Sequence, residues 1–129
     1  MTVENILIQL DDAAQGLYYM SESDYPFETF LYPKNSENPT EIQDVLSPQN
    51  LLDWLKKPIE TLVEIVELDF FFRNMLKNEP KFIQLIETLT ANLTDILVYK
   101  VGQIEIECYI IGKTQTGDFA GLKTIAIET

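Results

Sequence analysis

Residues 122–128 form a run that favours an extended strand near the end of a chain of 129 residues: Leu122-Lys123-Thr124-Ile125-Ala126-Ile127-Glu128. Successive side chains of a strand point to opposite faces, so two isoleucines face one way, and a leucine, a threonine and an alanine face the other. Because both faces are largely apolar, we expect this strand to be buried on both sides. Such a strand belongs to a sheet with other elements packed on each face.

Two further strands precede this run and are joined by short turns. Residues 96–101 form the first, and alternation of apolar with other residues over 104–110 predicts the second, with one buried face. A Gly-Gln pair separates them, and residues 114–118 are a turn by composition. Turns this short cannot hold a crossover, so the strands pair antiparallel. We therefore predict an α+β fold, a three-layer α/β/α sandwich with a mainly antiparallel central sheet.

Helical spacing occurs in two segments of the N-terminal half. Residues 3–15 place apolar side chains three and four positions apart, with Thr2 as the expected N-cap. Ser47-Pro48 is a typical helix start, and a short helix over 51–55 should follow it. Trp54 lies at helical spacing with leucines, which predicts a place in the core.

The middle of the chain predicts a strand followed by a helix. Residues 61–68 are rich in β-branched side chains and indicate a largely buried strand, after which Asp69 is expected to be an N-cap. Pro80 opens a clear amphipathic helix. The predicted apolar stripe of this helix consists of Phe82, Ile83, Ile86, Leu89, Thr90 and Leu93.

An acidic segment near the N-terminus combines small polar side chains with rigid aromatic rings. The side chains that favour a turn in it are Ser21, Ser23 and Asp24. Pro26 restricts the residue before it to an extended conformation. We predict a loop over 20–26 that feeds a strand over 27–32 and presents Glu22 outward.

Length and composition predict one domain over residues 1–129. With 46% hydrophobic side chains, the chain can bury a core without a metal, a disulfide or a cofactor. Cys108 lies in an apolar strand pattern and is expected to be a core residue rather than a nucleophile. No apolar run reaches the roughly 18 residues of a membrane span, and the first ten residues do not resemble a secretory signal. We expect a cytoplasmic protein.

The charge of the chain restricts its partners. It has 21 acidic and 9 basic side chains, a formal net charge of −12, and no histidine. We expect it to bind neither nucleic acid nor an anionic membrane, because contact with phosphates depends on lysine and arginine patches. A basic protein or a metal-containing site on a partner would be attracted. An acidic surface that only maintains solubility is the alternative.

Several kinds of catalytic site are improbable for this composition. Without histidine, the commonest general base and the commonest transition-metal ligand are both missing. The sequence contains no Gly-rich phosphate loop and no Cys-x-x-Cys pair. A carboxylate-dependent enzyme that uses Glu22 with Asp24 is an alternative, but two acids in one loop are a weak signal.

Two blocks of the sequence are specific enough to indicate a family. They are Gly16-Leu17-Tyr18-Tyr19-Met20-Ser21-Glu22-Ser23-Asp24-Tyr25-Pro26-Phe27-Glu28 and, towards the C-terminus, Val98-Tyr99-Lys100-Val101-Gly102-Gln103-Ile104-Glu105, Gly112-Lys113-Thr114, Ala120-Gly121-Leu122 and Glu128-Thr129. In these blocks the chain resembles the nuclease A inhibitor family. Members of that family bind and block a magnesium-dependent, sugar-non-specific endonuclease.

This resemblance implies a site as well as a fold. It implies a single α/β/α sandwich that inhibits by inserting an acidic loop residue and the C-terminal threonine into the nuclease active site. These residues match Glu22 and Thr129 of this chain. Glu22 would meet a basic side chain, and Thr129 would approach the partner's Mg²⁺, in a 1:1 complex of two monomers. The neighbouring residues expected in the contact are Ser21, Ser23, Asp24 and Glu128.

One feature of the family has no counterpart here. The family carries an acidic-aromatic pair between its Phe-Phe segment and its last helix, whereas residues 74–80 contain only Glu79 as an acid. The second contact is either absent or supplied by Asp69 or Glu79. A non-catalytic adaptor on the same scaffold, binding another basic protein, is the alternative function.

Overall fold

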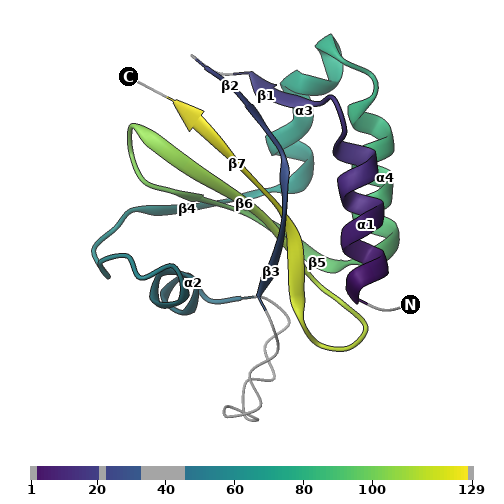
Figure 1. The fold of residues 1–129 in the computed structure, drawn as a ribbon. Helices are drawn as coiled ribbons and strands as arrows, with labels where there is room; N and C mark the ends of the chain where they lie inside the picture. Colours follow the sequence, from purple (N-terminus) through teal and green to yellow (C-terminus); the bar gives the residue numbers. More distant parts are fainter. Residues whose placement is uncertain (1–2, 21–22, 33–45, 128–129) are drawn as a thin grey trace.

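An antiparallel sheet of five strands forms the centre of the computed structural model, which describes residues 3–20, 23–32 and 46–127 (Figure 1). In chain order the elements are α1 (Val3–Ala14), β1 (Tyr18–Met20), β2 (Asp24–Pro26), β3 (Glu28–Tyr32), α2 (Pro48–Trp54), β4 (Val63–Glu67), α3 (Leu68–Asn78), α4 (Phe82–Asn92), β5 (Thr94–Val101), β6 (Glu105–Lys113) and β7 (Phe119–Ile127). The strand order is β3-β7-β6-β5-β4, and every neighbouring pair is antiparallel. The predicted α+β class with an antiparallel sheet is confirmed.

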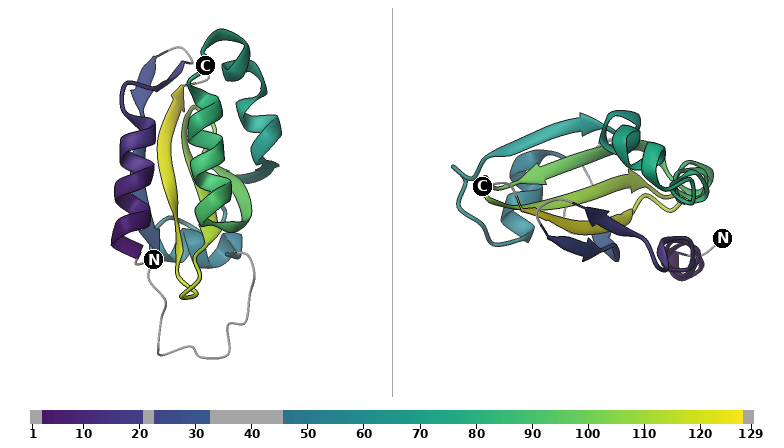
Figure 2. Two further views of the ribbon diagram at one scale, coloured as in Figure 1. Left: turned by 90° about the vertical axis from the view of Figure 1, so that its right-hand side faces the viewer. Right: turned by 90° about the horizontal axis from the view of Figure 1, so that it is seen from above.

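The two faces of the sheet are covered unequally. Helices α1, α3 and α4 lie on one face, and the short helix α2 lies on the other (Figures 1 and 2). The larger core, between the sheet and the three helices, includes Leu10, Phe72, Leu85, Leu89, Val98, Cys108, Ile110 and Leu122. The smaller core, under α2, consists of Phe30, Leu46, Leu51, Leu52, Tyr99, Val101, Tyr109 and Ile111. Cys108 is a buried core residue, as predicted.

The hydroxyl of Tyr99 has a hydrogen-bond partner inside the smaller core. Its ring is buried, and its hydroxyl donates a hydrogen bond of 2.6 Å to the carbonyl oxygen of Leu46. Burial raises the pKa of Tyr99 to about 12, although this hydrogen bond to Leu46 acts in the opposite direction. The hydroxyl therefore stays neutral and satisfied in the core.

Strand β7 is buried on both faces only in its first half. On the helix-covered face, Leu122 and Ala126 are completely buried along its whole length. On the α2 face, Lys123 is exposed, and Ile125 and Ile127 are half-buried. The predicted cover on both sides therefore ends before the C-terminal end of β7, where the α2 face opens to solvent.

Two predicted strands differ in their burial. The predicted strand over 61–68 is β4, the last strand in the sheet order, and its residue Ile65 is 43% exposed. An edge strand is covered less than an inner one, so the prediction of a largely buried strand was wrong. Strand β6 was predicted to have one buried face, but both of its faces are buried. Tyr109 and Ile111 are buried on the α2 face, and Cys108 is buried on the other.

The helices also correct two predictions, the N-cap of α3 and the buried face of α4. Glu67 is the N-cap of α3, so Asp69 lies in the first turn of the helix instead, where its charge suits the helix dipole. Helix α4 buries Phe82, Leu85 and Leu89, whereas Ile83 is 51% exposed and Thr90 is exposed. The predicted stripe was rotated, because packing against α1 and the sheet selects the face of α4 that is buried.

Trp54 and Thr2 complete the comparison. Trp54 is 44% exposed and packs against Phe30 and Tyr32, with ring centroids 5.2 and 5.5 Å apart. It therefore lies at the border of the smaller core and not inside it. Helix α1 begins at Val3 as predicted, but the expected cap Thr2 lies outside the described residues.

Candidate functional site

The acidic segment near the N-terminus forms a β-hairpin and not a loop. β1 and β2 pair antiparallel, with Tyr19 opposite Tyr25 and Met20 opposite Asp24. The ring of Tyr19 stacks on Phe71 of α3, with centroids 5.2 Å apart. The prediction of a loop over 20–26 was wrong, because residues 24–26 pair with residues 18–20, which lie before the polar run.

The hairpin is attached to the open end of β7. The Thr124 hydroxyl lies 3.0 Å from the carbonyl oxygen of Pro26 and 3.3 Å from that of Tyr25, so it can donate to either. The next residues of the chain continue into β3, in which Glu28 pairs with Lys123 of β7. Figures 1 and 2 show the hairpin and the C-terminal end of β7 at the same end of the sheet. Two segments about 100 residues apart in sequence therefore share one surface.

The predicted site residues of this surface are only partly described. Ser23 and Asp24 are exposed, Ser23 in a bend and Asp24 in β2. The predicted contacts Ser21, Glu22, Glu128 and Thr129 lie outside the described residues.

The two candidates for a second acidic contact lie at opposite ends of α3. Asp69 is exposed in its first turn. Glu79 follows its last turn and is half-buried, and its carboxylate accepts a hydrogen bond of 3.2 Å from the backbone N–H of Lys81. Ten residues of α-helix span about 15 Å, so these two acids cannot serve a single contact point. Glu79 already stabilises the connection to α4.

A groove of about 300 Å³ runs along the uncovered α2 face beside the hairpin. It is lined by Tyr25, Pro26, Glu28, Glu105, Glu107, Tyr109, Lys123, Thr124 and Ile125. Three of the four charged side chains in this lining are carboxylates. Lys123, the fourth, lies 3.9 Å from a carboxylate oxygen of Glu28. The groove thus continues the acidic surface of the hairpin onto the sheet.

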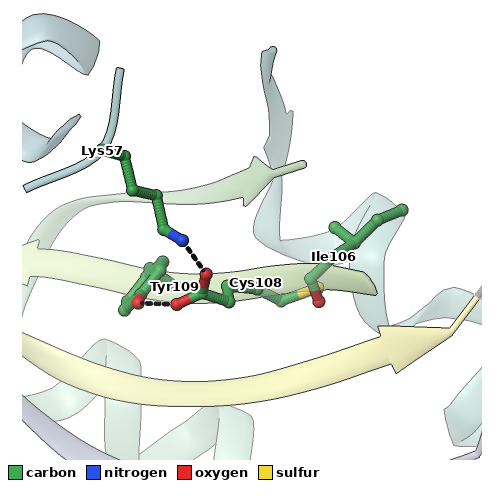
Figure 3. Close-up of polar contacts among 5 residues, drawn as sticks. Lys57, Ile106, Cys108 and Tyr109 are labelled. Carbon is green, nitrogen blue, oxygen red and sulfur yellow. Dashed lines mark hydrogen bonds and ion pairs between the residues drawn. The ribbon is translucent and has the colours of Figure 1, made fainter. Parts of the chain in front are cut away.

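Glu107 is held in the floor of this groove by two partners. Lys57, from the segment after α2, forms an ion pair with its carboxylate, and the Tyr109 hydroxyl donates a hydrogen bond of 2.7 Å (Figure 3). Burial alone would raise the pKa of Glu107, but the hydrogen bonds and positive charges outweigh it, and the pKa is lowered. Burial and the Glu107 carboxylate raise the pKa of Tyr109. Sequence patterns gave no sign of this cluster, because Lys57 is distant from Glu107 in the chain.

The lowered pKa makes the Glu107 cluster a source of pH-dependent stability. Because the folded pKa lies below the ordinary value of 4.5, the contribution is complete above that value and is lost as the pH falls through the folded pKa. We expect Glu107→Gln to reduce the free energy of unfolding at pH 7, with a difference from the wild type that shrinks below about pH 5. Urea unfolding from pH 7 to about pH 3.5 measures this. A difference that is independent of pH would contradict it, and Glu87→Gln on the exposed side of α4 is the matched control.

The described residues offer no separate chemical site. Among them, no three histidine, cysteine, aspartate or glutamate side chains are arranged to hold a metal ion. Every buried side-chain nitrogen and oxygen atom in the described ranges has a hydrogen-bond partner, so no unpaired polar atom marks a hidden pocket. None of the helices in the described part of the chain is long and apolar enough to cross a membrane.

Comparison with known families finds a match over most of the chain. The model of the family described as nuclease A inhibitor-like protein matches residues 4–129, which is nearly the whole chain. A comparison with curated proteins finds no match.

Proposed function

The chain belongs to the nuclease A inhibitor-like protein family, and we propose that it inhibits a magnesium-dependent, sugar-non-specific endonuclease by occluding the active site in a 1:1 complex. The acidic hairpin and the end of β7 form the inhibitory surface. The high negative charge of the chain suits this role, because a nuclease active site is built to attract the phosphates of its substrate.

The observation that carries this proposal is the attachment of the hairpin to β7. β3 and β7 pair antiparallel, from Tyr32 opposite Phe119 to Glu28 opposite Lys123. Beyond this ladder, the Thr124 hydroxyl of β7 contacts the carbonyl oxygens of Tyr25 and Pro26, so β2 also lies beside β7. The next residues of the two segments lead to Glu22 on one side and to Thr129 on the other.

The order of these residues in the chain supports a shared contact. Glu22 stands between β1 and β2 in the sequence, and Thr129 follows β7 by two residues. The Thr124 hydroxyl holds β2 close to β7. We propose that Glu22 and Thr129 enter one active site together.

The chemistry of a nuclease site explains why these two groups would block it. Such a site holds Mg²⁺ and basic side chains that neutralise a scissile phosphate. The Glu22 carboxylate would form a charge-assisted hydrogen bond with a basic side chain. The hydroxyl or terminal carboxylate of Thr129 would reach the partner's Mg²⁺ directly or through water, since this ion takes oxygen ligands. The two groups together would replace the phosphate, and no catalysis by this chain is required.

Asp69 is more available than Glu79 to form a second acidic contact with the nuclease. Asp69 is exposed in the first turn of α3, directly after β4. Glu79 is engaged with the backbone of Lys81. We therefore propose Asp69 as the additional acidic contact, with Ser21, Ser23, Asp24 and Glu128 bordering the main one.

An inhibition assay tests the proposal directly. A magnesium-dependent, sugar-non-specific endonuclease encoded in the same genome is titrated with this protein while plasmid degradation is followed. We expect activity to fall in proportion to added protein and to reach its minimum near one equivalent. We also expect association to slow as salt concentration rises, because opposite charges guide the encounter. Full nuclease activity at micromolar excess of this protein would refute the proposal, and a non-nuclease as the main protein retained in a pull-down would favour the adaptor.

A further inference from the structure

A second pocket, of about 280 Å³, lies between the hairpin, the edge of the sheet and α3. The stacked rings of Tyr19 and Phe71 hold α3 beside the hairpin at this place, and Figure 1 shows β1 and α3 as neighbours. We call it the α3 pocket. Its lining includes one residue of the hairpin, two of the sheet and three of α3, namely Tyr19, Val66, Lys100, Phe70, Phe71 and Arg73.

The α3 pocket differs from the groove on the α2 face in the sign of its charge. Both charged side chains in its described lining, Arg73 and Lys100, are basic. Lys100 already has a partner, because its Nζ lies 3.6 Å from a carboxylate oxygen of Glu64. Glu67 lies on the opposite face of the sheet, since it pairs with Leu97 of the smaller core. Arg73 is therefore the base of this lining for which the described residues provide no ion pair.

Arg73, the single arginine of the chain, is supported by an aromatic ring. Its guanidinium carbon lies over the ring of Phe70, 5.5 Å from the ring centroid. The face of an aromatic ring attracts a cation, so Phe70 favours this position of the guanidinium. Phe70 is 61% exposed and Arg73 is exposed, so both can be reached from solvent. A guanidinium on a ring can use its N–H groups for two parallel hydrogen bonds to a carboxylate.

The other charged side chains of α3 near Arg73 lie one helical turn before it and one turn after it. They are Asp69 and Lys77, and both are exposed and outside the described lining of the α3 pocket. Positions four residues apart on a helix are neighbours, about 6 Å apart. A partner that offers a base to Asp69, as proposed above, is therefore placed to offer an acid to Arg73.

The charge of the whole chain restricts how an anion can reach Arg73. At a net charge of −12, the protein repels small free anions and nucleic acid. A carboxylate on a basic protein is instead attracted together with its carrier, because the rest of the carrier's surface meets the acids of this chain. The ligand that fits the α3 pocket is therefore an aspartate or glutamate side chain of a basic partner.

We propose that the α3 pocket binds an acidic side chain of the nuclease through Arg73, beside the base that Asp69 would meet. The opposite charges of Asp69 and Arg73 would then fix the orientation of the inhibitor on the enzyme. A surface with the reverse order of charges would bring like charges together and bind poorly. This inference rests on the proposed function, and its experiment separates the two.

The test uses the sign of a charge change. Arg73→Gln removes one positive charge and makes the net charge −13 instead of −12. If only bases of the nuclease faced this surface, the variant would bind more tightly, whereas loss of a contact with a carboxylate makes it bind more weakly. Lys77→Gln is the matched control, because it makes the same charge change on the same helix outside the pocket lining. Binding to the same endonuclease is measured by stopped-flow association and by dissociation after dilution, and circular dichroism verifies that each variant is folded.

We expect Arg73→Gln to bind roughly tenfold more weakly than Lys77→Gln, the effect of truncating an interface side chain that matters. Most of the loss should lie in the dissociation rate, because the added negative charge does not slow the encounter with a basic partner. Lys77→Gln should bind like the wild type or slightly more tightly. If the wild type inhibits and Arg73→Gln binds at least as tightly as Lys77→Gln, the inference is overturned while the proposed function stands. If the wild type does not inhibit, both are overturned.

Discussion

Gly121→Ala is expected to lower the free energy of unfolding by more than about 3 kcal/mol, a large part of the stability of a typical domain. Gly121 lies in the first half of β7, directly against β6. A Cβ atom added at this position would stand 1.7 Å from the carbonyl oxygen of Ile110 and 2.8 Å from its carbonyl carbon. These are backbone atoms of the neighbouring strand, so no side-chain rotation can relieve the contact, and the two central strands must separate.

Urea unfolding followed by far-UV circular dichroism measures this effect. Gly16→Ala is the matched control, because a Cβ atom there has no neighbour within 4 Å, and only the cost of a positive φ, about 1 kcal/mol, remains. Equal stability of the two variants would contradict the close approach of β6 and β7. Since β7 lies at the proposed inhibitory surface, we expect Gly121→Ala also to weaken the proposed nuclease inhibition.

Glu22→Ala and deletion of Thr129 are each expected to weaken binding to the nuclease by roughly 2–4 kcal/mol, or about 30- to 1000-fold. In the proposed complex, each change would remove one partner of a buried charged contact and leave a basic group or a metal position of the nuclease without its ligand.

Glu87→Ala is the matched control for these two variants. Glu87 is an exposed acid on α4, so this substitution removes the same charge without touching the proposed surface. We expect it to change the association rate only slightly. Inhibition constants from plasmid degradation distinguish the variants. Wild-type inhibition by both Glu22→Ala and the Thr129 deletion would refute the site assignment, even if the protein proves to be a nuclease inhibitor.

Much of the fold could be predicted because periodicity is local information. The alternation in β5, β6 and β7 and their short turns predicted an antiparallel sheet, and the spacing over residues 3–15 predicted α1 with its correct start. The predicted start of α2 is also correct, with the Ser47 side chain accepting a hydrogen bond from the N–H of Asn50. The family resemblance agrees with the match over residues 4–129.

Burial was predicted less well, because it depends on neighbours that are distant in sequence. β4 has the composition of a buried strand but lies at the edge of the sheet. Ile83 has an apolar side chain on a helix, yet the face of α4 that packs is set by α1 and the sheet. Trp54 packs at the border of the small core that α2 forms. In each case the sequence specifies the element, and the packing specifies its exposed side.

The candidate site was likewise predicted only in part from the sequence. Residue types and the family blocks predicted an acidic contact segment over 20–26 and a contact at Thr129, because those signals lie within short runs of sequence. Only the folded chain brings β2 beside the end of β7, through the Thr124 hydroxyl and the carbonyl oxygens of Tyr25 and Pro26. The groove with Glu107 likewise forms from separate strands and turns. Local patterns carry the chemistry of each side chain, whereas long-range pairing in the sheet decides which side chains act together.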